Sequence, residues 1–180
     1  MNFRMKIFDL YVPAFLKKRI LGQLWGLTAR SFGCEAPQTK GFSYKECLKE
    51  YAAFTKREAE RAIHQNQELE AIKDRLYQNA CQLGQELKKK FRIRHKEEVM
   101  TMSRILYRLI GIEFQGNNKG DVTISRCFFS KFYSKEVCQI ISSLDQGVAA
   151  GLSGGGKLHF YQKITEGKDC CKAHFGLDKG

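Results

Sequence analysis

The sequence predicts an α+β protein in which an N-terminal helical layer is followed by a β-β-α-β-β antiparallel sheet unit. Two observations carry this prediction. Apolar residues recur at helical spacing through most of the first 110 residues, whereas the last third contains four short strand-like segments around a single helical one. The length of 180 residues and the hydrophobic content of 43% fit a single domain, residues 1–180, with a core of its own.

Residues 1–42 are expected to form a basic helical segment followed by a linker. The apolar positions of the first 32 residues fit one amphipathic helix or two, and Pro13 marks the break between them. The stretch GCEAPQTKG (33–41) then has the composition of a loop.

Residues 43–110 are expected to form the helical layer. Ser43 and Glu46, in the stretch SYKE, have the form of a capping box, in which each side chain accepts a hydrogen bond from the backbone amide of the other residue. Apolar stripes then predict three helices, which begin after Ser43, near Leu69 and near Glu97.

Residues 111–180 are expected to form the sheet unit. The segments IEF (112–114) and DVTISRCFF (121–129) flank QGNNKG, whose Gly and Asn residues favour a hairpin turn. Helical spacing returns from Ser134 to Val148, and GLSGGGK then reads as a flexible connector. The strands KLHFYQKI and KDCCKAHFGL follow, with the turn TEGK between them.

The net charge of +12 is compatible with nucleic acid, an anionic membrane or an anionic small molecule as partner. The run KKKFRIRHK (88–96) lies where a helix is expected to end, so its cations complement the helix dipole. No nucleic-acid motif accompanies it, which disfavours nucleic acid. The basic N-terminal segment, with Lys17, Lys18 and Arg19, leaves peripheral membrane contact open.

Seven cysteines, an odd number, are scattered over a chain that shows no secretory leader. No apolar run approaches the roughly 18 residues that a membrane-spanning helix needs. Free thiols in a reducing cytoplasm are therefore expected. The chain also lacks any Cys-x-x-Cys pair, which disfavours a structural zinc site of the usual spacing.

Four of these cysteines lie in the last third of the chain, where a candidate site can be derived. Cys138 and Asp145 are seven residues apart on one predicted helix and share a face. Strand alternation turns Cys171 toward the core and Cys170 outward. We therefore expect Cys138, Asp145 and Cys171 to meet at one cavity with Cys127 at its rim, although buried thiols that only pack remain the plain alternative.

The segment CFFSKFYSKEVCQIISSLDQGVAAGL, with the later TEGKDCCKAHF, resembles the L-2-amino-thiazoline-4-carboxylic acid hydrolase family. The resemblance covers residues 110–176. It rests on a cysteine that closes a strand, a Cys-x6-Asp helix and a terminal Gly-x3-Cys strand with aromatic residues. The matching positions are Cys127, Cys138, Asp145, Gly167, Cys171 and Phe175, and Ala173 departs from the first aromatic position. The same spacing also resembles small-ligand-binding domains of the vinyl-reductase type.

The resemblance implies a hydrolase that opens a C–N or C–S bond of a small cyclic amidine-like substrate. The nucleophile would be a thiolate, from Cys138 or Cys171, or an activated water, and Asp145 would pair with the substrate amino group. His159 or His174 would be the base, although strand alternation puts His174 on the other face. No cofactor is required, but thiols and a carboxylate are also the ligand types of a zinc site.

Two other functions remain open at this point. The first is a non-enzymatic module that binds a small ligand or a metal between the helical layer and the sheet. The second is a binder of nucleic acid or of an anionic membrane through the basic segments. The sequence fixes neither the substrate nor the oligomeric state.

Overall fold

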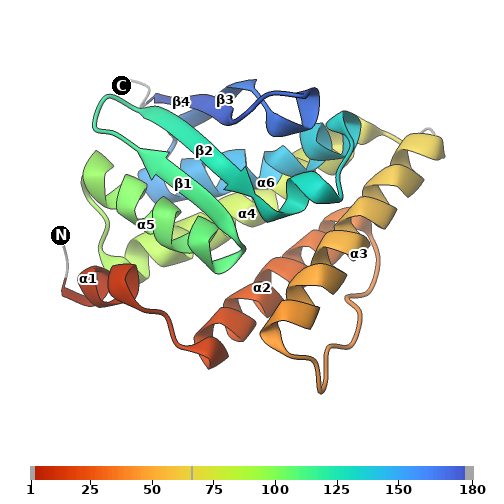
Figure 1. The fold of residues 1–180 in the computed structure, drawn as a ribbon, viewed down its shortest axis with the longest axis horizontal. Helices are drawn as coiled ribbons and strands as arrows, with labels where there is room; N and C mark the ends of the chain where they lie inside the picture. The colour runs from red at the N-terminus through yellow and green to blue at the C-terminus, as the bar shows by residue number, and fades with distance from the viewer. Residues whose placement is uncertain (1–2, 66, 177–180) are drawn as a thin grey trace.

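The computed structural model describes residues 3–65 and 67–176, and it confirms the α+β architecture (Figure 1). The helical layer contains α1 (Phe3–Leu10), α2 (Ala14–Phe32), α3 (Tyr44–His64), α4 (Leu69–Phe91) and α5 (Lys96–Leu109). The sheet unit contains β1 (Ile112–Gly116), β2 (Asp121–Cys127), the 3-10 turn η1 (Phe128–Lys131), α6 (Lys135–Ser153), β3 (Lys157–Gln162), η2 (Ile164–Glu166) and β4 (Cys171–Gly176). The strands form one four-stranded antiparallel sheet in the order β1-β2-β4-β3, and α6 connects its two strand pairs.

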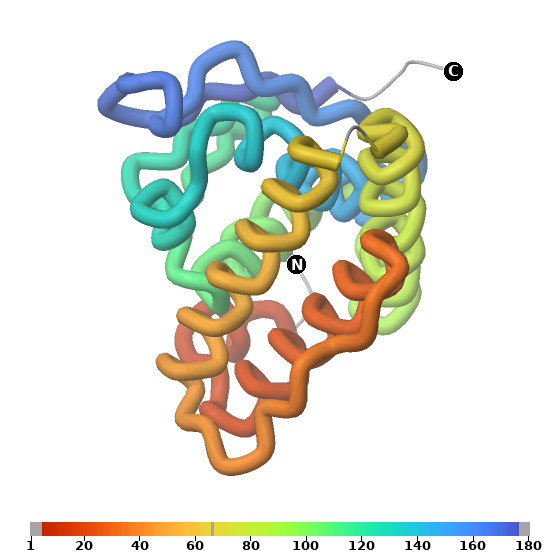
Figure 2. Tube along the Cα trace, turned by 90° about the vertical axis from the view of Figure 1, so that its right-hand side faces the viewer, coloured from red at the N-terminus to blue at the C-terminus, as the bar shows by residue number. Residues whose placement is uncertain are grey.

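The sheet covers α6 and α4, and the pair α2 and α3 lies on the side of the molecule farther from the sheet (Figure 1). A view from the side shows the strands along the top with the long helices below them (Figure 2). One cluster of buried apolar side chains contains residues from every helix and every strand named above. Within the described ranges, no helix is both long enough and apolar enough to cross a membrane.

The predicted starts of the first helices are confirmed. Helix α2 begins directly after Pro13. At the start of α3, the Ser43 amide donates to Glu46 Oε2 at 2.6 Å and the Glu46 amide donates to Ser43 Oγ at 3.3 Å. The capping box therefore satisfies two amide donors that the first helical turn leaves without partners.

The first hairpin turn is also confirmed, and the side chain of Asn117 holds it. Its Oδ1 accepts hydrogen bonds from the backbone amides of Lys119, Gly120 and Asp121, at 2.9, 2.9 and 3.0 Å. Gly120 has a φ of 103°, a conformation that glycine adopts without strain.

The strand expected over residues 121–129 ends earlier, at Cys127. Residues 128–131 form a 3-10 turn instead, which buries Phe129 and turns the chain away from the sheet toward α6. The last two strands are likewise shorter than expected, because residues 164–166 form a second such turn and β4 begins only at Cys171. Apolar content alone does not distinguish a strand end from a buried turn.

Helices α4 and α6 approach each other so closely that their backbones touch at three glycines. A Cβ atom on Gly147 would lie 2.2 Å from the Tyr77 carbonyl oxygen, and one on Gly151 would lie 2.1 Å from that of Cys81. A Cβ on Gly84 would lie 2.6 Å from the Val148 carbonyl oxygen. These glycines set the position of α6 and of the side chains on its other faces.

Candidate functional site

A cavity of about 130 Å³ lies between the helical layer and the sheet unit. Its wall consists mainly of apolar side chains from α2, α4, α5 and α6. Cys127, Cys138, Asp145 and Cys171 are also part of the wall. Cys138, Asp145 and Cys171 thus line one cavity, as expected, and Cys127 lines it with them.

Regular secondary structure places three of these side chains. Cys138 and Asp145 are two turns apart on α6. The N-cap residue of this helix is Ser134, whose Oγ accepts a hydrogen bond from the Val137 amide at 3.3 Å. Cys171 begins β4 on its inward face, and its residue is 8% exposed. Cys170 is the more exposed of the adjacent pair, as predicted from the strand alternation.

Asp145 is the carboxylate of the cavity wall, and among the described residues its hydrogen-bond partner is a tyrosine. The Tyr107 hydroxyl donates to Asp145 Oδ1 at 2.8 Å, and the Tyr107 ring stacks on Phe114 with 4.9 Å between the ring centroids. Asp145 keeps some exposure toward the cavity, but the surrounding protein shields it from bulk water. This burial raises its pKa from 3.8 to about 6, although the Tyr107 hydrogen bond and the charge of Lys163 act in the opposite direction.

The three thiols of the cavity wall are held in their neutral form. Burial raises the pKa of Cys127 to about 12, and it also raises the pKa of Cys138 and of Cys171. The Cys171 sulfur accepts a hydrogen bond from the Ile164 amide at 3.3 Å, which ties η2 to β4. Because a thiolate is the nucleophilic form of cysteine, none of these thiols is activated.

Lys163 supplies a positive charge at the edge of this site. Its Nζ donates to Ser142 Oγ at 3.0 Å and lies 5.6 Å from the centroid of the Phe160 ring. The charge of Lys163 opposes the rise in the pKa of Cys138, Asp145 and Cys171, so its field reaches all three. A carboxylate on a bound ligand would find its cation here.

The structure does not bring His159 and His174 to the cavity. They face each other across β3 and β4, and both are exposed on the outer face of the sheet. His174 Nδ1 lies 3.4 Å from Asp121 Oδ1 on that face. The cause is strand alternation, because the neighbouring Leu158 and Phe175 point inward and are buried. Neither histidine is placed to act as a base or a ligand-binding group in the cavity.

Sequence reasoning missed Tyr107 and Lys163. Tyr107 stands beside the predicted apolar stripe of its helix, and a buried tyrosine hydroxyl needs a hydrogen-bond partner, which was the available signal. Lys163 gave no such signal, since a lysine at the end of a strand is ordinary. Its role depends on how the segment after β3 folds back over α6.

The side chains of the cavity wall do not form a metal site. Among the described residues, no three His, Cys, Asp or Glu side chains are arranged to hold a metal ion. Cys127, Cys138, Asp145 and Cys171 thus share a wall without converging on one point. Zinc, which their chemistry allowed, would need these side chains to move.

Comparison of the chain with protein-family models, with curated proteins and with solved structures gives no match in any of the three. Functional inference therefore rests on the cavity itself.

Proposed function

We propose that the protein binds a small, largely apolar molecule in this cavity and pairs a cationic group of that molecule with Asp145. The observation that carries the proposal is a carboxylate in a mainly apolar wall. Among the described residues, Asp145 receives one hydrogen bond, from Tyr107, although a carboxylate has about four acceptor sites. A ligand with N–H donors would occupy the remaining sites.

The pKa of Asp145 limits which ligands suit the site. With a pKa of about 6, the group is mostly ionised at neutral pH, and an ionised carboxylate in an apolar wall favours a cation over a neutral donor. The volume limits the ligand as well: an apolar cavity of about 150 Å³ takes up one benzene molecule. The ligand is therefore about the size of one ring, and an amidine or amine on it would supply the cation.

A second candidate is hydrolysis of a cyclic amidine-like substrate that also carries a carboxylate. The observation that favours it is the pair of opposite charges, since Asp145 would hold the amidine-like group and Lys163 the carboxylate. The neutral thiols disfavour a cysteine nucleophile, so the attacking group would be water, with Asp145 as its general base. Water adds to the ring carbon, a C–N or C–S bond breaks, and the proton on Asp145 passes to the departing nitrogen or sulfur.

One comparison tests the binding proposal. Benzamidine, a ring with an amidinium group, should bind the wild-type protein in calorimetry at pH 7.5, and the neutral analogue benzamide should bind much more weakly. Asp145→Asn should weaken benzamidine binding more than about 10-fold, because the charge-assisted hydrogen bonds are lost. Glu113→Gln, which removes an exposed carboxylate of β1, should leave it unchanged. Equal binding by all three proteins would refute the pairing with Asp145.

The hydrolysis candidate has a separate readout. Hydrolysis of 2-amino-thiazoline-4-carboxylate should fall about 100-fold or more in Asp145→Asn and less than about 10-fold in Cys138→Ala. A greater loss of hydrolysis in Cys138→Ala would indicate that Cys138 is the nucleophile. If the wild-type protein binds benzamidine but does not hydrolyse the thiazoline, the hydrolysis candidate is refuted and non-enzymatic binding is the remaining function.

We also assign the protein to the cytoplasm. All seven of its cysteines are free, which is the state that a reducing compartment maintains. Labelling of intact and of permeabilised cells with a thiol reagent that does not cross membranes tests this assignment.

A further inference from the structure

A group of large apolar side chains is exposed at the turn between α1 and α2. Among the described residues, five large apolar side chains are exposed, and four of them belong to this turn. The N-terminal apolar patch consists of Ile7, Leu10, Tyr11 and Phe15, which are 48%, 86%, 66% and 74% exposed. Single exposed apolar residues are common on protein surfaces, but several exposed together at one turn mark an interaction site.

The patch is not the result of a detached helix, because the other face of α1 is firmly held. Met5 is fully buried in the main core. Arg104 forms two hydrogen bonds with the Asp9 carboxylate, at 3.1 and 2.6 Å. Arg108 donates to the carbonyl oxygens of Phe8 and Asp9 at 2.7 and 2.6 Å, at the C-terminal end of the helix. Helix α1 is therefore fixed on α5 while its apolar face points to solvent.

On both helices, basic side chains lie one helical turn behind Leu10 and Phe15, the helical patch residues nearest the turn. Lys6 precedes Leu10 by four residues on α1, so the two share a face. On α2, Lys18 and Arg19 follow Phe15 by three and four residues, and all three are exposed. One turn corresponds to about 5.4 Å along the helix axis. The apolar side chains thus lie at the turn itself, with positive charge set back from it.

Acidic charge is nearly absent from this part of the chain. Residues 1–32 contain six basic residues and a single acidic one, Asp9, whose carboxylate is paired with Arg104. In Figure 1 the turn between α1 and α2 lies at the lower edge of the molecule, on the side away from β3 and β4. The patch is therefore open to a flat partner that is apolar inside and anionic at its surface.

From this geometry we infer that the turn between α1 and α2 docks the protein on an anionic lipid bilayer. The N-terminal apolar patch enters the boundary of the acyl chains, and Lys6, Lys18 and Arg19 lie among the headgroups. The contact is peripheral, since no described helix suits a membrane span. A second copy of the chain fits the surface less well, because a two-fold interface would bring equal positive charges together. This inference is independent of the cavity and its ligand.

Vesicle flotation with the full chain tests the docking. The probes are vesicles of phosphatidylcholine alone and of phosphatidylcholine mixed with phosphatidylserine. The wild-type protein should float with the mixed vesicles, and added salt should weaken this binding. Leu10→Ser combined with Phe15→Ser should lower the partition coefficient more than about 10-fold, because two apolar side chains lose their burial. Lys18→Gln combined with Arg19→Gln should lower it about 30-fold, or about five-fold per charge, on mixed vesicles only.

Tyr161→Ser is the matched control, since Tyr161 is 61% exposed but lies on β3, away from the patch. This variant should bind mixed vesicles like the wild-type protein. All variants should unfold at the wild-type temperature, because the altered side chains are exposed. Three results would overturn the inference: no vesicle binding by the wild-type protein, an equal loss in Tyr161→Ser, or a wild-type dimer in sedimentation that Leu10→Ser with Phe15→Ser converts to a monomer.

Discussion

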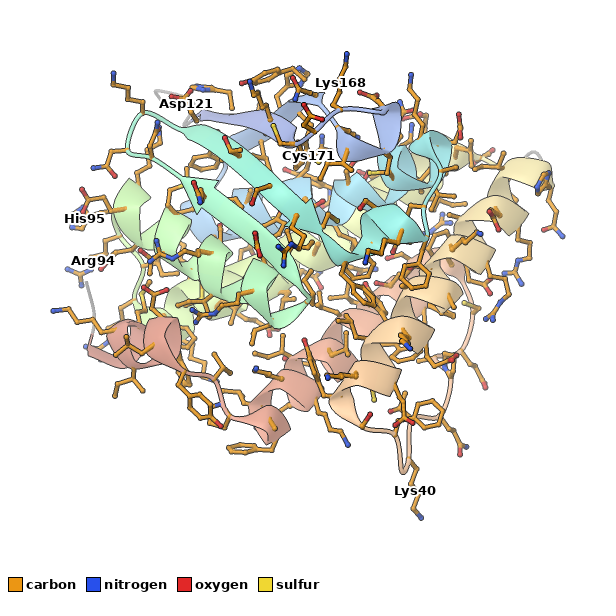
Figure 3. All side chains as sticks on the ribbon, in the orientation of Figure 1. Lys40, Arg94, His95, Asp121, Lys168 and Cys171 are labelled. Carbon is orange, nitrogen blue, oxygen red and sulfur yellow. The ribbon has the colours of Figure 1, made fainter. Side chains whose placement is uncertain are left out.

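Asp145 and Asp121 have the same side chain and a similar local partner, yet they lie in opposite environments. Asp145 accepts a hydrogen bond from Tyr107 in the cavity, and burial raises its pKa to about 6. Asp121 lies on the outer face of the sheet, where hydrogen bonds with Asn117 and His174 lower its pKa. Figure 3 labels Asp121 at the end of the sheet near the first hairpin turn, and Cys171, which borders the cavity, nearer the middle of the sheet.

The difference between the two carboxylates teaches that the removal of water, rather than the hydrogen-bond partner, decides the charge state. Tyr107 lowers the pKa of Asp145 as Asn117 lowers that of Asp121, but only Asp145 is desolvated enough for burial to prevail. A binding site for a cation needs a carboxylate in this desolvated state. A carboxylate whose hydrogen bonds are already made by water or by a neighbouring residue gains little from a ligand.

The largest expected effect comes from breaking the packing that buries Asp145. Gly147→Ala would place a Cβ atom 2.2 Å from the Tyr77 carbonyl oxygen, so α6 must move away from α4. We expect a loss of about 3 kcal/mol in the free energy of unfolding, measured by urea denaturation. Gly22→Ala on α2 is the control, since no atom outside the neighbouring stretch of its own helix lies within 4 Å of its new Cβ, and it should stabilise the protein by up to about 1 kcal/mol. Equal stabilities of the two variants would show that α4 and α6 can separate freely.

Neutralising Asp145 should change the dependence of stability on pH. The folded pKa of about 6 lies above the unfolded value, so the stabilising contribution of the protonated group is complete below about pH 4 and is lost as the pH rises through 6. Asp145→Asn removes this loss and should be more stable than the wild-type protein at pH 8, by up to about 3 kcal/mol. The two proteins should converge near pH 4 in denaturant titrations. A variant that is less stable at pH 8 would mean that a cation already neutralises Asp145.

Removing the tyrosine partner should have a smaller effect on the same carboxylate. Tyr107→Phe keeps the ring that stacks on Phe114 and removes only the hydroxyl donor. Because that hydrogen bond lowers the pKa of Asp145, we expect the pKa to rise further, and stability at pH 8 to fall by about 1 kcal/mol. Carbon NMR of the aspartate carboxyl groups over a pH series measures the shift. An unchanged pKa of Asp145 would mean that packing alone, and not the Tyr107 hydroxyl, orients this carboxylate.

The smallest effect, of opposite sign, is expected at Asp121. Its pKa is lowered in the folded chain, so its stabilising contribution is present above the unfolded pKa and is lost as the pH falls through the folded one. Asp121→Asn should therefore be slightly less stable than the wild-type protein at pH 7 and equal to it in strong acid. Thermal unfolding at both pH values measures the difference. A more stable variant at pH 7 would remove the contrast between the two carboxylates.

The sequence was sufficient for the parts of the site that follow from local periodicity. Spacing on one helix and alternation on one strand placed Cys138, Asp145 and Cys171 on a common wall. The partners of Asp145 were not predictable in this way. Tyr107 reaches it only because α5 packs beside α6, and Lys163 lies at the edge of the site only because the segment after β3 folds back over α6.

The same distinction applies to the fold. The order of helices and strands followed from hydrophobic patterning, and Pro13 and Ser43 marked helix starts through their own chemistry. The strand end at Cys127 was misplaced, because the buried Phe129 in a 3-10 turn has the same apolar pattern as a strand residue. The contact of α4 with α6 was also not evident, since a glycine in a helix indicates close packing only when the facing helix is known.

Calorimetric titration of benzamidine across pH 4.5 to 8 tests the central claim most directly. The association constant depends on the cavity, on the charge of Asp145 and on the ligand together. Benzamidine stays cationic over this range, so the affinity should follow the ionisation of Asp145. We expect the association constant to rise about 10-fold per pH unit below 6 and to level off above it. Asp145→Asn should bind weakly and with no dependence on pH. A flat profile for the wild-type protein, or the same rise in the variant, would contradict the assignment of Asp145 as the cation-binding group.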